Sequence, residues 1–322
     1  MGDIIKKILI LYGGKSYEHE ISIKSFNNIF KNIDNNIYNI DKIYISKDNI
    51  WYYKNIKVKN IIKTLKKYDI VFPILHGNNG EDGKIQGMLE LFNIKYIGCN
   101  MTSSILCYDK LLTKIILNHY NIPQVPYTTD INKTKYPCIV KPCKSGSSIG
   151  INIANNKEEL YKCINEALKY DNKYIIEKYI NAKEYECAIY SNKDDIICNV
   201  GEIDKKNNFY DYNDKYINKI STIIPANINK KLENKIKKYA ILAYKLLGCN
   251  TLSRIDFLYD IDNKKLYLNE INTIPGFTDT SMYPKLIGNL GYSYQELITK
   301  LIESEKDWNI SFFDFINTLW YY

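Results

Sequence analysis

Four polar side chains near the end of the chain have a spacing that suits metal and phosphate chemistry. The strand-like run TLSRIDFLYD carries Arg254 and Asp256, and the run KLYLNEIN carries Glu270 and Asn272. Alternate residues of a strand point to one face, so two paired strands would bring all four side chains together. Two carboxylates and an amide oxygen form an all-oxygen site that suits Mg²⁺. Ordinary amphipathic strands also alternate polar residues, but the Pro-Gly turn after NEIN favours the functional interpretation.

Arg254 is the single arginine of the chain, beside 43 lysines. A biased coding composition produces such a ratio without any functional demand, so a lone surface arginine is the competing interpretation. Only guanidinium offers a planar fork that binds two oxygens of a carboxylate or phosphate at once. The place of Arg254 two residues before Asp256 predicts that it faces a transferring phosphoryl group.

A second candidate site is the loop KPCKSGSSIG (141–150). Its small residues let backbone amides approach an anion, and Lys141 would neutralise phosphate charge. The strand IIEKYI, with Glu184 just beyond it, could hydrogen-bond an adenine through its backbone. The run GGKS is not a P-loop, because that motif requires glycine where Leu9 stands.

Glu18 and His76 follow two buried strands, in the runs EHEIS and HGNNGEDG. Ligands bind at the carboxyl ends of strands in open α/β sheets, so both are candidates for a substrate site. We expect Glu18 to anchor an ammonium group. A histidine in such a loop is more often structural than a ligand partner.

Hydrophobic periodicity predicts a mixed α/β (α+β) chain. The expected strands are 6–14, 69–77, 136–142, 173–180, 251–260 and 265–272, and the expected helices are 20–33, 84–92, 103–120, 156–170 and 229–247, with a helix pair between Ser281 and Ile302. We expect an N-terminal open α/β domain over 1–100, a central subdomain over 101–182, a C-terminal subdomain with the metal site over 183–305 and an extension over 306–322. Apolar residues recur at helical spacing in the extension, which we expect to pack on the body of the protein.

The composition argues against several classes of protein. The net charge is +8, but the lysines are scattered and form no block, so a nucleic-acid partner is not expected. No apolar run has membrane length and no secretory leader is recognised, so we expect no membrane partner and a cytoplasmic enzyme. The eight cysteines form no CxxC pair and lie apart from the three histidines, which argues against a zinc site or a disulfide framework.

Taken together, the motifs closely resemble those of the D-alanine–D-alanine ligase family, which has the ATP-grasp fold. The resemblance spans residues 6 to 304 and rests on GGKSYEHEIS, LHGNNGEDGKIQGMLEL, YDK, KPCKSGSSIG, FYDYNDKY, SRIDF and NEINTIPGFTDTSM, in the order and approximate spacing of the family. It implies an ATP-grasp fold in which ATP lies between the central and C-terminal subdomains.

The resemblance also implies roles for individual residues. ATP would be bound by Lys110, Lys141, Ser148, Glu177, Lys178, Ile180, Glu184 and Lys215, and two Mg²⁺ ions, or Mn²⁺ in their place, by Asp256, Glu270 and Asn272. The catalytic residues would be Glu18, Ser147, Tyr216 and Arg254, and the two D-alanines would lie among Glu18, His76, Gly276, Ser281 and Met282.

The implied reaction joins two D-alanines through a D-alanyl phosphate, for the synthesis of peptidoglycan precursors. D-alanine and ATP are then the expected small-molecule partners, and a homodimer is compatible with this interpretation. Three alternatives stay open: an ATP-grasp ligase with another second substrate such as D-lactate, a non-catalytic nucleotide-binding module, and a dinucleotide-dependent oxidoreductase. Tyr216 favours the dipeptide, because similar ligases that make D-alanyl-D-lactate carry phenylalanine there. The oxidoreductase is disfavoured because GGKSYE lacks the last glycine of its fingerprint.

Overall fold

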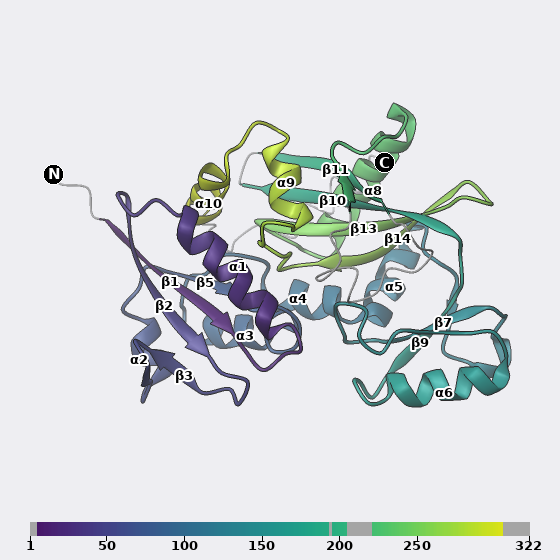
Figure 1. Cartoon of the computed structure of the whole chain (residues 1–322), viewed down its shortest axis with the longest axis horizontal. Coiled ribbons are helices and arrows are strands. Elements are labelled where there is room, and N and C mark those ends of the chain that lie inside the picture. The colour runs from purple at the N-terminus through teal and green to yellow at the C-terminus, as the bar shows by residue number, and fades with distance from the viewer. Residues whose placement is uncertain (1–4, 193–194, 205–220, 305–322) are drawn as a thin grey trace.

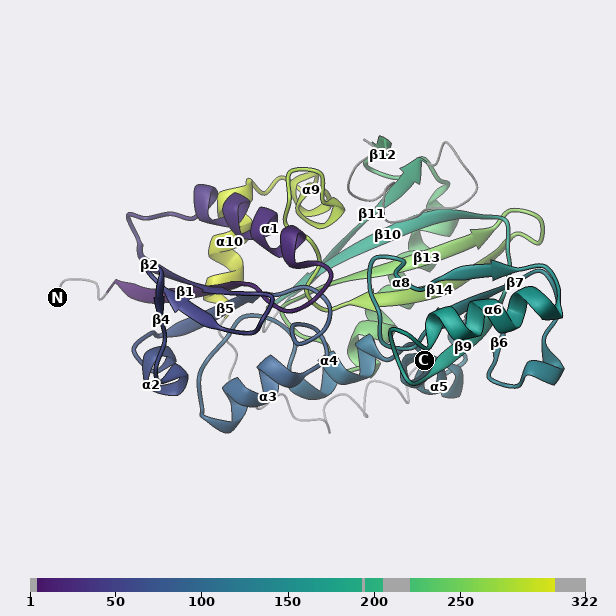
Figure 2. The same cartoon turned by 60° about the horizontal axis from the view of Figure 1, so that its bottom comes forward.

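The computed structural model describes residues 5–192, 195–204 and 221–304, and this part of the chain forms three sheets with helices packed against them (Figure 1). The N-terminal sheet lies at one end of the molecule, and the other two sheets lie towards the opposite end (Figures 1 and 2). Lys215, Tyr216 and the extension 306–322 lie outside the described residues. The expected mixed α/β class is confirmed.

The N-terminal sheet has a parallel centre. β1 (Lys6–Gly13) pairs in parallel with β2 (Tyr38–Ile45) and β5 (Ile70–Ile74), while β3 (Trp51–Tyr53) and β4 (Ile56–Lys57) extend one edge. Its helices are α1 (His19–Asn32), α2 (Ile61–Leu65) and α3 (Lys84–Leu91). β1 and β5 are apolar and buried on both faces, as in open α/β sheets. β1, β5, α1 and α3 confirm the strands and helices expected here, whereas β2, β3, β4 and α2 were not predicted.

A small antiparallel sheet follows, in the order β6-β9-β7-β8. Its strands are β6 (Tyr127–Thr128), β7 (Cys138–Pro142), β8 (Asn152–Ala154) and β9 (Tyr174–Lys178), and it is accompanied by a short 3-10 turn (Ile131–Lys133) and by α6 (Lys157–Ala167). The buried face of α6 packs on the sheet, with Leu160 against Val140 in one apolar cluster. The loop 143–151 connects β7 to β8 and is thereby held at the edge of this unit.

The largest sheet is antiparallel, in the order β12-β11-β10-β13-β14. Its strands are β10 (Ala182–Ser191), β11 (Ile196–Asp204), β12 (Ser221–Ile223), β13 (Leu252–Asp260) and β14 (Lys265–Asn272). α8 (Lys230–Leu246) covers one face, where Ile236 and Ala240 share a core with Ile255 and Phe257 of β13. Alternation along β13 therefore directs Arg254 and Asp256 to the opposite face.

The helix expected over 103–120 is two helices, so that prediction was wrong. α4 (Met101–Tyr108) ends and α5 (Lys110–His119) begins at Asp109, whose backbone is extended. The Asp109 carboxylate accepts hydrogen bonds from the amides of Leu111 and Leu112, so it caps the new helix instead of continuing the old one. The break brings the amide of Lys110 to the carbonyl of Cys143, at 3.0 Å, and so ties α5 to the loop after β7.

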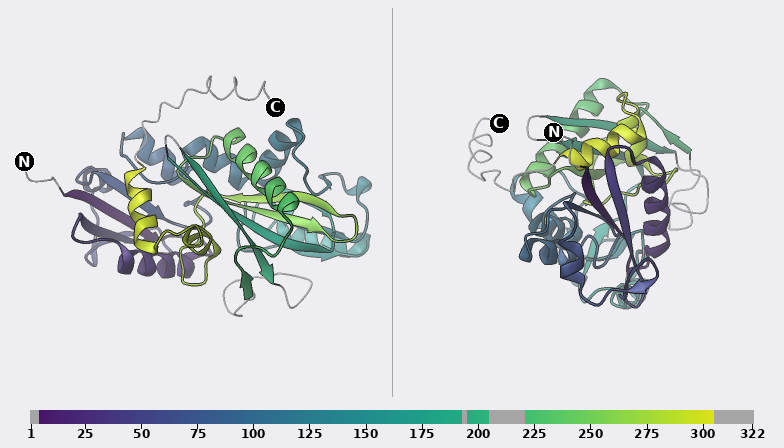
Figure 3. Two further views of the ribbon diagram at one scale, coloured as in Figure 1. Left: turned by 90° about the horizontal axis from the view of Figure 1, so that it is seen from above. Right: turned by 90° about the vertical axis from the view of Figure 1, so that its left-hand side faces the viewer.

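The expected C-terminal helix pair is confirmed as α9 (Met282–Gly288) and α10 (Tyr294–Glu303). Both helices lie between the N-terminal sheet and the large sheet (Figure 3), and one apolar cluster joins Ile8 and Phe26 to Leu286 and Leu301. This cluster packs the N-terminal unit against the large sheet. Among the described residues, none of the helices combines the length and the apolar character that crossing a bilayer requires.

Candidate active site

Three carboxylates lie side by side across the large sheet. Asp256 of β13 is directly opposite Glu186 of β10 on one side and Glu270 of β14 on the other. Like charges at opposite positions of neighbouring strands are unfavourable, so such a row requires nearby cations. Arg254 contacts Asp256 and Glu186, and the Nζ of Lys110 lies 4.0 Å from a Glu270 oxygen. The convergence expected of Arg254, Asp256, Glu270 and Asn272 is confirmed by the pairing of β13 with β14.

The Arg254 guanidinium holds Asp256 in the two-pronged way that only arginine permits. Its Nε and Nη2 donate to the two Asp256 oxygens at 2.8 and 2.7 Å, and Asn272 donates to the same carboxylate at 3.1 Å. The Glu186 Oε2 lies 3.0 Å from Arg254 Nε. Burial opposes the charge, but Asp256 and Glu186 raise the pKa of Arg254 well above its usual value. The arginine is therefore a fixed cation within the site.

A β-bulge adds one residue that the sequence pattern did not reveal. Asp256 pairs with Glu270, but the next residue, Phe257, pairs with Leu268, so Asn269 is the extra residue of β14. Bulges re-aim side chains and are frequent beside active sites. Here the Asn269 side chain accepts a hydrogen bond from the Nζ of Lys141 at 3.1 Å. Asn269 thus joins the site although its sequence position assigns it to the opposite face.

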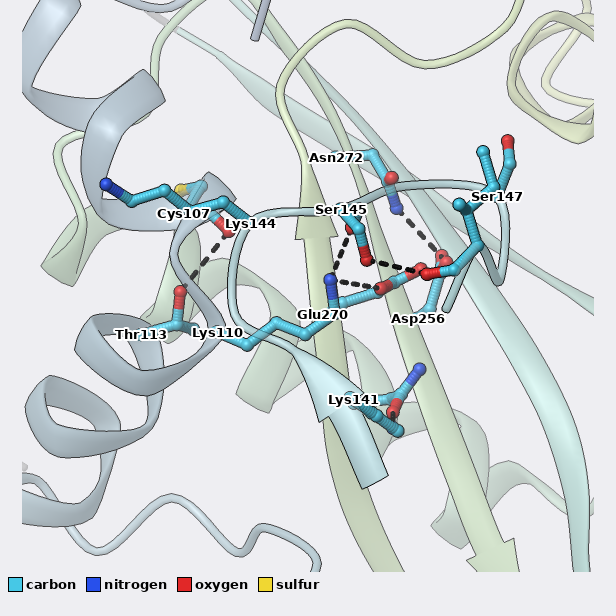
Figure 4. A network of polar contacts seen from close by, with 12 residues as sticks. Cys107, Lys110, Thr113, Lys141, Lys144, Ser145, Ser147, Asp256, Glu270 and Asn272 are labelled. Carbon is cyan, nitrogen blue, oxygen red and sulfur yellow. Dashed lines mark hydrogen bonds and ion pairs between the residues drawn. The ribbon is translucent and has the colours of Figure 1, made fainter. Parts of the chain in front are cut away.

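The first of two adjoining pockets lies between the small sheet and the large sheet. It brings together most of the predicted ATP ligands and two of the predicted metal ligands: Lys110, Lys141, Ser148, Glu177, Lys178, Ile180, Glu184, Asp256 and Glu270. Figure 4 shows Lys110 reaching Glu270 and the backbone of Ser145, whose carbonyl accepts from Lys110 Nζ at 2.5 Å. Burial lowers the pKa of Lys110, and Glu270 opposes this shift. The pocket therefore offers cationic groups to an anionic ligand beside a carboxylate pair.

Glu177 lies between two lysines on the floor of this pocket. Its oxygens are 2.8 Å from the Nζ of Lys114 and 2.6 Å from the Nζ of Lys141, and all three side chains are almost fully buried. Burial alone would raise the pKa of Glu177, but the two lysines lower it to about 2. The Glu177 carboxylate is thus engaged with Lys114 and Lys141. Lys114 was not predicted as a site residue. Its position one helical turn after Lys110 was the signal that could have placed it on the same side of the helix.

The loop 143–150 reaches from the small sheet to the N-terminal domain. Ser147 Oγ donates to the Glu18 carboxylate, and Ser147 and Ser148 have φ values of 50° and 59°, in the left-handed region. Non-glycine residues adopt that region at a cost, and such residues concentrate at functional sites. The predicted contact between Glu18 and Ser147 is therefore present, whereas the third member of the expected set, Tyr216, lies outside the described residues.

Gly150→Ala is expected to weaken this loop. Gly150 has a φ of 74°, and an added Cβ would lie 2.6 Å from the Tyr170 ring and 2.8 Å from Pro142. We expect a loss of about 1–2 kcal/mol in stability and a higher KM for ATP. The matched control is Gly288→Ala, where the added Cβ meets no atom within 4 Å. Urea unfolding and ATP titration of both variants test this expectation, and equal behaviour of the two would contradict it.

The second pocket lies between the large sheet and the N-terminal domain. It brings together the predicted substrate-side residues Glu18, His76, Ser147, Arg254, Gly276, Ser281 and Met282, together with Asn272. The two pockets share Gly146, Glu186 and Glu270 in their linings. Two ligands bound in them would therefore meet at the carboxylate row, beside Arg254.

His76, predicted as a substrate-side residue, is held in its loop by contacts with three other residues. Its ring lies 3.0 Å from Ser25 Oγ and 3.0 Å from the carbonyl of Ile274, and it also contacts Glu81 at 3.7 Å. Burial raises the pKa of Glu81 to about 7, and Glu81 in turn raises the pKa of His76 despite the burial of the ring. Glu81 was not predicted as a site residue, although it stands in the motif HGNNGEDG.

The oxygen donors at the row fit a magnesium site. Asp256, Glu270 and Asn272 offer carboxylate and amide oxygens on one face of paired strands, which are the ligands Mg²⁺ prefers. Within the ranges that the structure describes, no three His, Cys, Asp or Glu side chains converge as a metal cluster. Mg²⁺ is commonly held by one or two carboxylates together with substrate phosphates, and Asp256 and Glu270 supply two carboxylates here.

The large sheet and the small sheet enclose a lysine-lined pocket that has carboxylates at its end. This arrangement defines a ligase of the ATP-grasp class. Family models described as the D-ala D-ala ligase N-terminus and C-terminus match residues 7–99 and 117–303, and the chain belongs to the D-alanine–D-alanine ligase family.

Individual relatives agree with this assignment. D-alanine–D-alanine ligases of Clostridium novyi and Clostridium acetobutylicum are 40% and 41% identical, covering 92% of this chain and 97% of each relative. The structure of the D-alanine-D-alanine ligase from Coxiella burnetii has a TM-score of 0.81 at 30% identity, covering 99% of both chains. The VanG D-Ala:D-Ser ligase from Enterococcus faecalis has a TM-score of 0.82 at 32% identity, covering 94% of this chain and all of that one.

Proposed function

We propose that this protein joins two molecules of D-alanine to D-alanyl-D-alanine, converting ATP to ADP and phosphate, and so supplies a precursor for peptidoglycan. The observation that carries the proposal is the meeting of two pockets at the carboxylate row, beside a fixed arginine. A phosphate donor in one pocket and an amino acid in the other would bring their reacting atoms together there. The relatives named above favour D-alanine over D-lactate as the second substrate.

In the nucleotide pocket, the lysines would neutralise phosphate charge. Lys110 and Lys141 line the pocket. Lys215, which is not among the described residues, is proposed to bind the phosphates with them. The strand segment from Glu177 to Ile180 would receive adenine, Glu184 the ribose, and Ser148 the phosphates through its loop. Asp256, Glu270 and Asn272 would hold two Mg²⁺ ions, or Mn²⁺, which supply charge neutralisation on the transferring phosphoryl group.

In the substrate pocket, Glu18 would bind the ammonium group of the first D-alanine. Its contact with Ser147 closes the loop 143–150 over that group, and Tyr216 is proposed to complete the set. Arg254 and the amide near Gly276 would stabilise the oxyanion that develops at the carboxyl carbon. Ser281 and Met282 line the same pocket and are proposed to flank the second D-alanine.

The reaction then has two steps. A carboxylate oxygen of the first D-alanine attacks the γ-phosphorus of ATP, and ADP leaves with the electrons of the broken P–O bond. The neutral amine of the second D-alanine attacks the acyl carbon of the resulting acyl phosphate, phosphate leaves, and the nitrogen loses a proton. Positioning and charge neutralisation by the residues named above account for most of the catalysis.

The proposal also covers the domain boundaries, the cellular location and the assembly of the protein. We assign residues 1–100 to a substrate-side domain, 101–182 and 183–305 to the two ATP-grasp subdomains, and 306–322 to an extension. A cytoplasmic location follows from the place of ATP and D-alanine in the cell, and a homodimer is the proposed assembly.

A product assay tests the function. Purified protein with ATP, Mg²⁺ and D-alanine is expected to release ADP and D-alanyl-D-alanine in equal amounts. Removal of the divalent ion by EDTA is expected to stop both, and Mn²⁺ to restore them. Phosphate release without dipeptide would overturn the proposal. In competition, D-alanine and D-lactate should give dipeptide, and exclusive ester formation would establish the rival ligase.

A further inference from the structure

Glu186 is a charged residue of the site that the reaction outlined above does not use. The residue is 7% exposed, and it lines both pockets. A buried carboxylate is costly unless it is paired. It contacts the cation Arg254, whose Nε lies 3.0 Å from Glu186 Oε2. Glu186 therefore contacts Arg254, a residue that the proposed mechanism requires.

The place of Glu186 on the sheet suits it to this arginine. On β10 it is directly opposite Asp256, and Ala188, two residues further, is opposite Arg254. A long side chain reaches such a diagonal neighbour across an antiparallel pair. Glu186 and Asp256 thus approach the guanidinium from two neighbouring strands, and both contact its Nε.

Asp256 has two roles in the proposed reaction, to orient Arg254 and to bind a metal ion, and both use the same oxygens. Both of its oxygens accept hydrogen bonds from Arg254, at 2.8 and 2.7 Å, yet the same oxygens are proposed to bind a metal ion. Each oxygen has two lone pairs, so it can bind a metal and still accept from Arg254, but the charge of the metal weakens the hydrogen bond to the guanidinium. In the part of the chain that the structure describes, Glu186 does not join Asp256 and Glu270 as a three-acid metal cluster. Glu186 is the second carboxylate beside Arg254, and the proposed metal ligands do not include it.

We propose that Glu186 is a positioning residue that holds the Arg254 guanidinium in place when Asp256 binds the metal. Arg254 then keeps its orientation towards the developing oxyanion while the metal weakens its bonds to Asp256. The inference rests on the proposed function. Glu186 is not among the proposed ligands of the metal or of the reacting groups, so the proposal assigns its effect to its contact with Arg254.

Glu186→Gln tests the proposal by two independent measurements. We expect kcat to fall about 10-fold, with the KM values for ATP and D-alanine nearly unchanged. Mn²⁺ binding in the presence of ADP, followed by electron paramagnetic resonance, is expected to weaken about 10-fold. The reason is that Arg254 then has Asp256 as its remaining carboxylate here and competes more strongly with the metal for the Asp256 oxygens. The matched control is Glu202→Gln, a buried glutamate of β11 that pairs with Lys183 at 2.7 Å and should change neither quantity.

A double-mutant cycle separates positioning from other roles. In the Arg254→Lys background, Glu186→Gln should produce a much smaller further loss of kcat than in the wild type. An equal loss in both backgrounds, or unchanged kcat and Mn²⁺ binding in Glu186→Gln, would overturn the proposal. If thermal melting shows that the glutamine variant does not fold, Glu186→Thr provides the same cycle. The Mn²⁺ titration needs no dipeptide synthesis, so failure of the proposed function would be seen separately, in the wild-type product assay.

Discussion

Arg254→Lys is expected to lower kcat about 10²- to 10³-fold while the protein stays folded, because one donor to the developing oxyanion is lost. Lysine keeps the positive charge but cannot donate to both oxygens of one carboxylate from a planar fork. The variant would thus lose the two bonds to Asp256, at 2.8 and 2.7 Å, and the fixed orientation that they give.

The comparison requires kcat, the melting temperature and ADP affinity of each protein. The matched control is the reverse exchange Lys183→Arg on β10, where the lysine pairs with Glu202 and lines neither pocket. It should leave kcat unchanged. Near-normal turnover in Arg254→Lys would refute a role for the fork geometry, since charge alone would then suffice.

Glu177→Gln is expected to destabilise the fold by about 3–5 kcal/mol, because it leaves two buried lysines without their shared carboxylate. Lys114 and Lys141 flank Glu177 at 2.8 and 2.6 Å, and Glu177 is 2% exposed. Urea unfolding at pH 7 measures the loss. The control is Glu166→Gln, which removes an ion pair with Lys169 at the surface and should change stability little.

The same carboxylate predicts a pH dependence. Attraction to the two lysines, against the effect of burial, lowers the pKa of Glu177 from its ordinary 4.5 to about 2 in the folded protein. Its ionised form therefore stabilises the fold at pH values above 4.5, and this contribution is lost as the pH falls through 2. The stability gap between wild type and Glu177→Gln should be largest near neutral pH and narrow below pH 4.5. A gap that stays constant from pH 7 to pH 3 would contradict this assignment.

Local patterns were sufficient to predict the elements that carry the site. The apolar runs of β1 and β5 and the alternation along β13 and β14 are properties of neighbouring residues, so they are visible in the sequence. The pairing of β13 with β14 followed from their closeness along the chain. This is why the amino-acid sequence alone predicts the convergence of Arg254, Asp256, Glu270 and Asn272.

Other features depend on contacts that no local pattern encodes. Asp109 lies in a continuous helical period, and its capping role becomes clear only where Lys110 meets the loop at Cys143. Asn269 enters the site through a bulge that shifts the register of β14. Glu186 lies on β10, and no local pattern in the sequence indicates that β10 pairs with β13 and brings Glu186 to Arg254. Each miss concerns the tertiary neighbour of a residue and not its local conformation.

The central claim is that the carboxylate of D-alanine attacks ATP at the junction of the two pockets. D-alanine labelled with ¹⁸O in its carboxyl group tests this most directly, by mass spectrometry of the phosphate released during dipeptide synthesis. The account predicts one labelled oxygen in each phosphate, because the attacking oxygen stays on phosphorus when the amine displaces it from carbon. Unlabelled phosphate formed together with dipeptide would contradict it.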